Sequence, residues 1–112
     1  MIFSMSFNVV ITDNFKNEVK RLIKKYRSLK AELQALGKQL SESPTLGTPL
    51  GKDVYKVRLA IASKKKGKSG GARVITYVQI DEETVLLLSI YSKGEKDSIS
   101  DKEIQELLGE YT

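Results

Sequence analysis

The feature that most constrains the fold is a change in the spacing of apolar residues near the middle of the chain. From residue 54 onward, apolar residues alternate with polar ones or form continuous runs, which indicates strands. The chain must therefore join helices to a sheet, and its 112 residues suffice for one hydrophobic core. Before residue 41, apolar residues recur at the spacing of a helix face, at Phe15, Val19, Leu22, Ile23, Tyr26, Leu29, Leu33, Leu36 and Leu40.

The N-terminal part predicts a strand that leads directly into a helix. Residues Phe7–Ile11 are rich in β-branched and aromatic types, which favour strands. Thr12–Asn14 then offer side-chain oxygens that can cap a helix start. The helix that begins near Phe15 is amphipathic and carries basic residues on its outer face.

A second helix is predicted over Leu29–Leu40. Gly37 interrupts its pattern near the end, and Ser41–Pro44 stops it. The two helices are joined around Arg27 and Ser28 and should therefore form a hairpin.

The second half of the chain predicts three strands. Residues 41–52 contain both prolines and two glycines, so we expect a loop there. Val54–Ala62 and Ala72–Ile80 form a hairpin, whose long basic tip is Ser63–Gly71. The most apolar segment, Thr84–Tyr91, should be a central strand.

A last helix is expected after a cap at Ser98 or Ser100, with an apolar stripe of Ile104, Leu107 and Leu108 that most simply packs on the domain itself. The predicted fold is α+β: an N-terminal strand, a helical hairpin, a three-stranded antiparallel meander and a C-terminal helix. We expect the helices to cover one face of the sheet and the other face to be open to a ligand.

We expect residues 1–112 to form a single domain, with residues 1–5 disordered or upstream of an actual start at Met5. The first five residues lack the charge and length of a signal peptide, and no apolar run has the length of a membrane span. These observations predict a cytoplasmic protein that does not engage a membrane.

Charge is distributed very unevenly. Between Lys52 and Ile80 there are eight basic residues and one acid, an excess of +7. From Asp81 to the end there are nine acids and three lysines, which gives −6. A concentrated basic surface favours a polyanion such as RNA, or an acidic partner protein.

The chain contains no histidine and no cysteine. This composition excludes thiol catalysis, the usual zinc sites and histidine-based acid–base chemistry. Any catalysis must use Lys, Arg, Tyr or carboxylate groups, and we expect no metal and no cofactor.

The segment Gly67–Gly71 has the glycines and the Lys-Ser pair of a nucleotide-binding loop, but the pattern fails. Its first glycine would fall at Ala62, and the segment leads into a strand rather than a helix. A solvated hairpin tip is the simpler interpretation. However, Arg58 and Arg73 flank the tip on strands that must pair, and this favours a functional role for the tip over that of a simple solvated turn.

Three blocks of sequence, Tyr55–Ala60, Gly67–Ile75 and Leu88–Lys96, carry a family resemblance. Together they resemble the RelE/ParE toxin superfamily, specifically its HigB-like branch, and the likeness extends over nearly the whole chain from Phe7. The resemblance implies the toxin of a type II toxin–antitoxin system, a metal-independent endoribonuclease that cleaves mRNA on the ribosome. Its expected partners are a cognate antitoxin, the ribosome and mRNA.

The resemblance also implies which residues act. Arg58 and Arg73 correspond to the basic strand residues that grip the phosphate, and Tyr91 to an aromatic residue at the end of the sheet. Lys68 or Lys93 is the candidate base that deprotonates the ribose 2′-hydroxyl. The predicted catalytic set is thus Arg58, Lys68, Arg73, Tyr91 and Lys93, and the predicted RNA-binding set is Lys56, Lys64, Lys65, Lys66 and Lys96.

Several alternatives stay open on sequence alone. A ParE-like gyrase poison and an inactive nucleic-acid- or protein-binding module fit the same fold. Tyr91 could be a half-buried core ring, and Lys96 could simply pair with Glu95 or Asp97. A homodimer or a toxin–antitoxin heterotetramer is compatible with the sequence. We expect the antitoxin to cover the basic face with an acidic or amphipathic segment.

Overall fold

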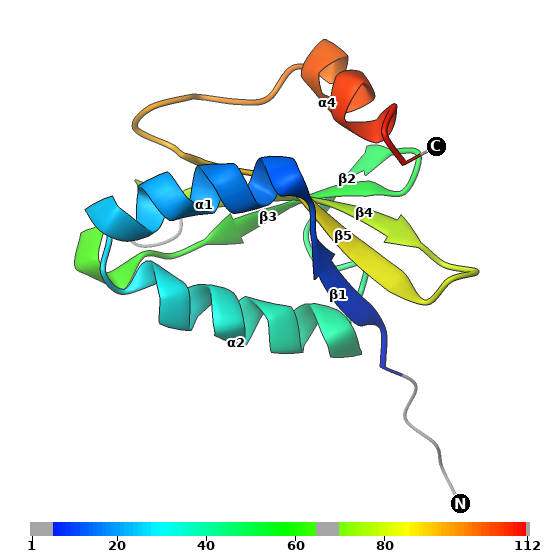
Figure 1. Ribbon diagram of the computed structural model, residues 1–112, viewed down its shortest axis with the longest axis horizontal. Coiled ribbons are helices and arrows are strands. Elements are labelled where there is room, and N and C mark those ends of the chain that lie inside the picture. Colours follow the sequence, from blue (N-terminus) through cyan, green and yellow to red (C-terminus); the bar gives the residue numbers. More distant parts are fainter. Residues whose placement is uncertain (1–5, 65–69, 112) are drawn as a thin grey trace, which may run out of the picture.

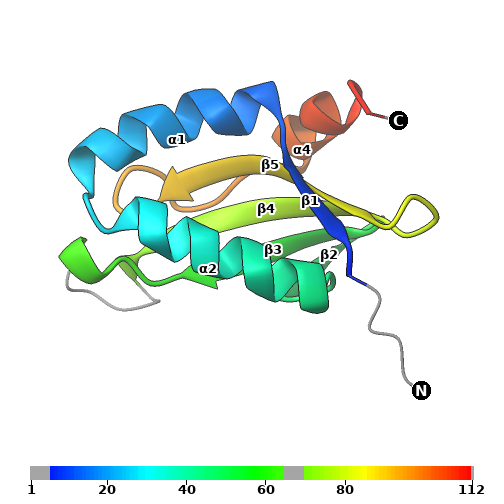
Figure 2. The ribbon, with the colours of Figure 1, turned by 60° about the horizontal axis from the view of Figure 1, so that its bottom comes forward.

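The computed structural model describes residues 6–64 and 70–111. Its five-stranded sheet has the strand order β1-β5-β4-β3-β2, with α1 and α2 on one face and α4 on the other (Figure 1, Figure 2). The α+β prediction is therefore confirmed. In chain order the elements are β1 (Asn8–Ile11), α1 (Asp13–Lys25), α2 (Leu29–Glu42), β2 (Thr48–Gly51), β3 (Val54–Leu59), the 3₁₀ turn η1 (Ala62–Lys64), β4 (Ala72–Gln79), β5 (Thr84–Ser92) and α4 (Asp101–Leu108).

The helical hairpin forms as predicted, with one difference. Thr12 caps α1 by accepting a hydrogen bond from the Phe15 backbone N–H at 3.2 Å. The predicted interruption at Gly37 is wrong, because α2 continues through it to Glu42. A helical glycine costs about 1 kcal/mol relative to alanine, and burial of Leu36 and Leu40 on either side can offset that cost.

The expected loop over residues 41–52 contains a strand. Thr48–Gly51 pairs antiparallel with β3, so the meander has four strands instead of three. The turn between β2 and β3 places Lys52 and Asp53 at positive φ, a conformation usually marked by Asn or Gly. Gly47 makes the close approach possible, since a Cβ there would lie 2.5 Å from the Lys56 carbonyl oxygen.

Within the described residues, β1 and β5 are the only neighbouring strands that run parallel. They pair from Asn8↔Thr84 to Ile11↔Leu87. Beyond Leu87, the edge of β5 is covered by a side chain. The Glu18 carboxylate accepts hydrogen bonds from the Ile90 backbone N–H at 3.1 Å and the Ser89 hydroxyl at 2.9 Å. Glu18 of α1 thereby supplies a hydrogen-bond acceptor for the part of β5 that has no strand beside it.

Replacing Glu18 with alanine is expected to lower the free energy of unfolding by about 1–3 kcal/mol, because it leaves the Ile90 N–H without its acceptor. Urea denaturation of the two proteins measures the difference. The matched control is Glu42→Ala at an exposed position, which should change stability by less than about 0.5 kcal/mol. Equal effects of the two substitutions would contradict the capping role.

The sheet has a packed core on each face. The larger core lies between the sheet and helices α1 and α2, and includes Phe15, Leu22 and Leu36. The second lies under α4, where Ile104 and Leu108 contact Leu88 and neighbouring residues of the sheet. Part of the face that we expected to be open is thus covered by α4. Ser100, rather than Ser98, caps α4 in a reciprocal arrangement with Glu103.

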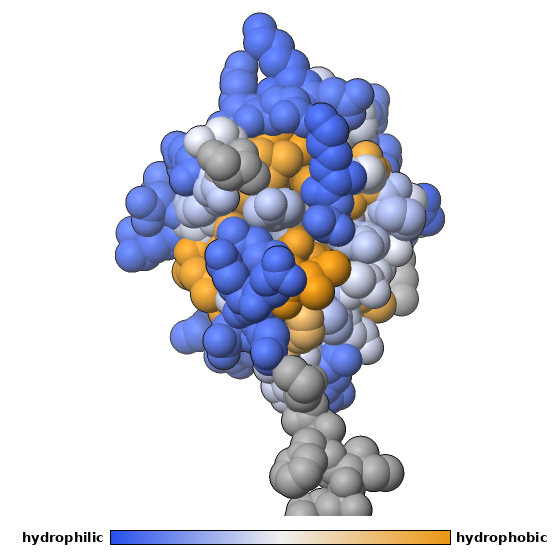
Figure 3. All heavy atoms as spheres, turned by 90° about the vertical axis from the view of Figure 1, so that its right-hand side faces the viewer, coloured by the Kyte–Doolittle hydropathy of each residue, from blue (hydrophilic) through white to orange (hydrophobic). Residues whose placement is uncertain are grey.

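Apolar side chains on the outer surface are few and scattered. Among residues 6–64 and 70–111, the large exposed ones are Val10, Ile11, Leu50 and Ile80. Figure 3 shows the apolar surface on one side of the molecule broken into separate patches by hydrophilic side chains. No helix in the described residues has the length and apolar character needed to span a membrane.

Candidate functional site

Three predicted site residues lie in one row across β3, β4 and β5, near the end of the sheet where β3 ends and β4 begins. Arg58 of β3 is opposite Arg73 of β4, and Arg73 is opposite Tyr91 of β5. Directly opposed residues on antiparallel strands project to the same face, so the three side chains share the α4 side of the sheet. Two arginines beside a phenol form a row able to bind an anion.

The row runs from solvent into the protein. Arg58 is exposed, whereas Arg73 and Tyr91 are 5% and 4% exposed. The Arg73 guanidinium donates to the carbonyl of Ala72 at 3.2 Å. In this structure, Arg58 is therefore the member of the row that an approaching ligand meets first.

The environment of Tyr91 keeps its phenol protonated. Burial raises the pKa of Tyr91 above its ordinary value of 10.0, while the Ile99 backbone, Arg73 and Lys96 offset part of the rise. A phenol that is neutral at physiological pH can donate a hydrogen bond and cannot serve as a base. Tyr91 is both a buried ring and a member of the row, so the two interpretations of this residue are compatible.

The loop between β5 and α4 brings two predicted lysines to the same region. The Lys96 ammonium lies 5.6 Å from the centre of the Tyr91 ring and pairs with Glu103 of α4. The expectation that Lys96 pairs with Glu95 or Asp97 is wrong. Lys93 instead contacts Asp97, donating to its backbone carbonyl at 3.0 Å.

Glu95 fixes this loop to the outer face of α1. Its carboxylate accepts hydrogen bonds from Arg21 at 2.7 Å and Lys25 at 3.2 Å. These two cations lower the pKa of Glu95 below its ordinary value of 4.5. The loop that carries Lys93 and Lys96 is thus attached to α1 through Glu95 and to α4 through the Lys96–Glu103 pair.

The lowered pKa of Glu95 predicts a pH-dependent contribution to stability. Because its folded-state pKa is depressed, the contribution is present above pH 4.5, the ordinary value, and is lost as pH falls through the folded-state value. The melting temperature of Glu95→Gln should be lower than that of the original chain near pH 7, and the difference should shrink as the pH falls below 4.5 and the Glu95 carboxylate becomes protonated. Differential scanning calorimetry across this range measures the gap, which 1 M salt should narrow because the pairs are exposed. A difference in melting temperature that does not shrink as the pH falls below 4.5 would contradict the role of the carboxylate.

The remaining predicted lysines divide into three groups. Lys56 lies on β3 two residues before Arg58, on the same face. Lys64 lies elsewhere: its ammonium donates to the Ser92 hydroxyl at 2.8 Å and lies 5.5 Å from the Tyr26 ring. The structure therefore does not bring Lys64 into the row. Lys65, Lys66 and Lys68 lie outside the described residues.

Sequence reasoning missed three acidic residues that organise the region: Glu18, Glu95 and Glu103. Only Glu103 carried a local signal, since it stands three residues after Ser100 in a capping-box pattern. Glu18 has a local partner in Asn14, but its partners on β5 and the partners of Glu95 on α1 are more than 60 positions away, at separations that no local pattern shows. In the described ranges, no group of three or more acidic residues is arranged to hold a metal ion.

Comparison with a library of protein families gives one match that spans most of the chain. The model described as "RelE toxin of RelE / RelB toxin-antitoxin system" matches residues 12–109. The matched region contains α1, the whole row and α4, and excludes only β1 and the ends of the chain.

Solved structures with a similar fold agree with this match. A mutant of Escherichia coli toxin RelE in the free state superposes with a TM-score of 0.62 at 16% identity, covering 96% of this chain and 100% of that chain. The isolated E. coli RelE toxin gives a TM-score of 0.56 at 15% identity, with the same coverage. The toxin–antitoxin complex RelBE2 from Mycobacterium tuberculosis gives 0.57 at 18% identity, covering 80% of this chain and 94% of that chain. At these identities the superpositions show the shared fold.

Proposed function

The chain belongs to the RelE toxin family, and from this premise we propose that it is a ribosome-dependent endoribonuclease that cleaves mRNA. The observation that carries the proposal is the row of Arg58, Arg73 and Tyr91 across three adjacent strands. It places two guanidinium groups in line with a protonated phenol. These are the groups that stabilise a developing negative charge on phosphate.

In the proposed reaction, the ribose 2′ oxygen attacks the adjacent phosphorus as its proton passes to a base. The bond from phosphorus to the 5′ oxygen of the next nucleotide breaks, that oxygen leaves with a proton from a protonated lysine or arginine, and a 2′,3′-cyclic phosphate remains. Arg58 binds the phosphate first because it is exposed, and Arg73 stabilises the doubly charged intermediate. Tyr91 supplies a hydrogen-bond donor beside Arg73. The ribosome contributes by holding the mRNA in a reactive geometry, which reduces the demand on the toxin's own residues.

A proton acceptor is needed for the 2′-hydroxyl, and Lys93 and Lys68 are the two candidates. Lys93 lies two residues beyond Tyr91, and its ammonium contacts Asp97. In the base role it would have to leave Asp97, lose its proton and turn toward the row. No metal ion takes part in this scheme, since every charge is stabilised by an arginine, a lysine or the phenol.

Substrate access requires a local opening. Arg73 and Tyr91 are buried, and the Lys96–Glu103 pair lies over the Tyr91 ring. We propose that an RNA phosphate replaces the Glu103 carboxylate on Lys96 as the substrate enters. The cognate antitoxin would oppose this entry by covering the row of Arg58, Arg73 and Tyr91.

Induced expression in bacteria tests the proposal, with primer extension on a defined message. The original chain should produce cuts within codons, and Arg58→Ala should reduce them at least about tenfold, the cost of one charge-assisted contact. Arg58 is exposed, so its substitution should leave the fold intact. The matched control is Arg27→Ala in the exposed turn between α1 and α2, which should cut normally. Growth arrest without cuts, accompanied by a DNA-damage response, would overturn the proposal in favour of gyrase poisoning.

A further inference from the structure

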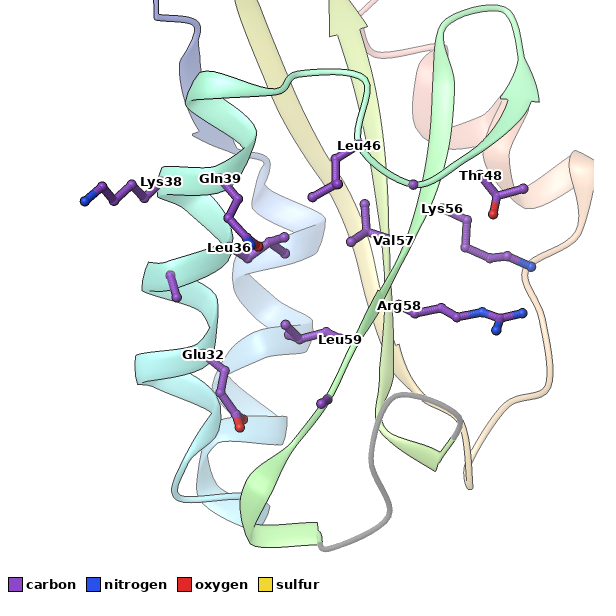
Figure 4. Close-up of a pocket in the computed structure, with 13 residues that line it drawn as sticks. Glu32, Leu36, Lys38, Gln39, Leu46, Thr48, Lys56, Val57, Arg58 and Leu59 are labelled. Carbon is purple, nitrogen blue, oxygen red and sulfur yellow. The ribbon is translucent and has the colours of Figure 1, made fainter.

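The turn η1, which follows β3, has its backbone fixed to the start of α2. The Ala62 N–H donates to the Glu32 carboxylate at 2.7 Å. The Ser63 N–H donates to the Ser28 hydroxyl at 3.0 Å. Figure 4 shows Glu32 projecting from α2 toward the strand that leads into this turn. The Lys64 side chain therefore extends from a backbone whose position is already set.

The Lys64 side chain connects the two strands that carry most of the row. Its ammonium donates to the Ser92 hydroxyl at 2.8 Å and to the Gly71 carbonyl at 3.3 Å. It also lies 5.5 Å from the centre of the Tyr26 ring, a distance at which a cation is attracted to an aromatic face. Ser92 is the last residue of β5, and Gly71 directly precedes β4. One side chain thus joins the end of one strand to the start of the other.

These contacts lie next to the residues proposed to act on RNA. The Gly71 carbonyl that receives the ammonium also accepts a hydrogen bond from the Lys93 backbone N–H at 3.0 Å. Ser92 stands between Tyr91 and Lys93 in the chain, and Tyr91 is paired with Arg73. A displacement of either contacted residue would therefore move the backbone that carries the row and one candidate base.

Lys64 acts from the opposite face of the sheet. Successive side chains of a strand project to opposite faces, so Ser92 faces away from the side that carries Tyr91. The Ser92 hydroxyl instead lies 3.5 Å from the hydroxyl of Tyr26, which belongs to the core beneath α1 and α2. The ammonium of Lys64 is thus separated from the row by the sheet itself, and can influence it only through the backbone.

We propose that Lys64 is a positioning residue that holds β4 and β5 in the register needed for RNA cleavage. This role rests on the proposed function and differs from the RNA contact predicted from the sequence. Without the ammonium, the Ser92 hydroxyl loses its nearest partner although it has no exposed surface. A misplacement of reacting groups by about 1 Å can cost about 100-fold in rate, so a small shift of Arg73 or Lys93 suffices.

Cleavage kinetics separate positioning from RNA binding. Lys64→Met keeps the length of the side chain and removes its charge and donors. In single-turnover cleavage of a defined message on programmed ribosomes, it should lower the maximal rate about tenfold to 100-fold. The toxin concentration that gives half the maximal rate should change less than about twofold. Lys64→Arg, which keeps the charge and the donors, should retain more of the rate than Lys64→Met.

The matched control is Lys56→Met. Figure 4 shows Lys56 projecting from β3 on the same side as Arg58, where it can reach RNA directly. Its loss should raise the half-saturating toxin concentration and leave the maximal rate nearly unchanged. The two lysines are therefore expected to show opposite kinetic patterns.

Hydrogen exchange of the free protein, followed by nuclear magnetic resonance, tests the link without ribosomes or RNA. Lys64→Met should speed exchange of the Lys93 amide about tenfold or more, because its acceptor at Gly71 is no longer held in place. The Leu36 amide, within α2, should exchange at the original rate and so exclude a general loss of stability. Lys56→Met should leave both amides unchanged.

Three results would overturn the inference: an unchanged Lys93 amide in Lys64→Met, an effect of this variant on half-saturation alone, or equal rates for Lys64→Met and Lys64→Arg. Failure of the proposed function gives a different pattern. In that case the original chain does not cleave mRNA, whereas faster exchange of the Lys93 amide still supports the link between Lys64 and the row.

Discussion

Arg73→Ala is expected to reduce mRNA cleavage on programmed ribosomes about 100-fold to 1,000-fold, the loss seen when one donor to a developing oxyanion is removed. Arg73 occupies the centre of the row, between Arg58 and Tyr91, so its removal separates the other two members. Single-turnover cleavage of a defined message at saturating toxin isolates the chemical step from binding.

The burial of Arg73 requires a control for folding. Arg73→Lys keeps the positive charge but loses the planar fork, so it should recover only part of the lost rate. Thermal unfolding of both variants shows whether the fold is retained. Full activity of a folded Arg73→Ala protein would remove Arg73 from the mechanism.

Leu88→Ala is expected to have the largest effect on stability, lowering the free energy of unfolding by about 2–5 kcal/mol. Leu88 has no exposed surface and lies on β5, in the core beneath α4. The register of β4 and β5 shifts beside it, between Ile75 and Thr76, and truncating a fully buried leucine leaves a cavity whose cost adds to the lost burial.

Chemical denaturation measures this loss, and the melting temperature should fall by roughly 10 °C or more. The same substitution at Leu50, which is 39% exposed on β2, provides the control and should cost less than about 1 kcal/mol. Similar losses at the two positions would contradict the assignment of Leu88 to the second core.

Several helices and strands were predictable because their capping residues and apolar spacing agree with the surfaces that they bury in the folded protein. Thr12 and the apolar spacing of α1 identified the first helix, and Ser100 was one of two predicted caps for the last. Alternation along Val54–Leu59 placed Arg58 opposite the apolar row, where the structure has it. The sequence also predicted that Val54–Ala62 and Ala72–Ile80 form a hairpin, and this pairing is what places Arg58 beside Arg73.

The rest depended on contacts that no local pattern encodes. Strand β2 contains Pro49 and Gly51, which usually mark a loop, and a proline is tolerated there because β2 is an edge strand. Its turn uses Lys52 and Asp53 in a conformation that their residue types do not predict. The apolar stripe of α4 predicts that this helix packs on the domain, but not that it lies on the face opposite α1 and α2.

The parallel pairing of β1 with β5 determines when, during synthesis, the sheet can form. The Thr12 hydroxyl donates to the carbonyl of Leu87, 75 positions later, so the start of the chain must wait for β5 to be synthesised. Long-range pairing of this kind slows folding, because the entropy of closing a long loop is lost before its contacts form. Arg73 likewise lacks its neighbour Tyr91 until β5 has emerged. A nascent chain therefore lacks the assembled row of Arg58, Arg73 and Tyr91 until β5 has left the ribosome exit tunnel.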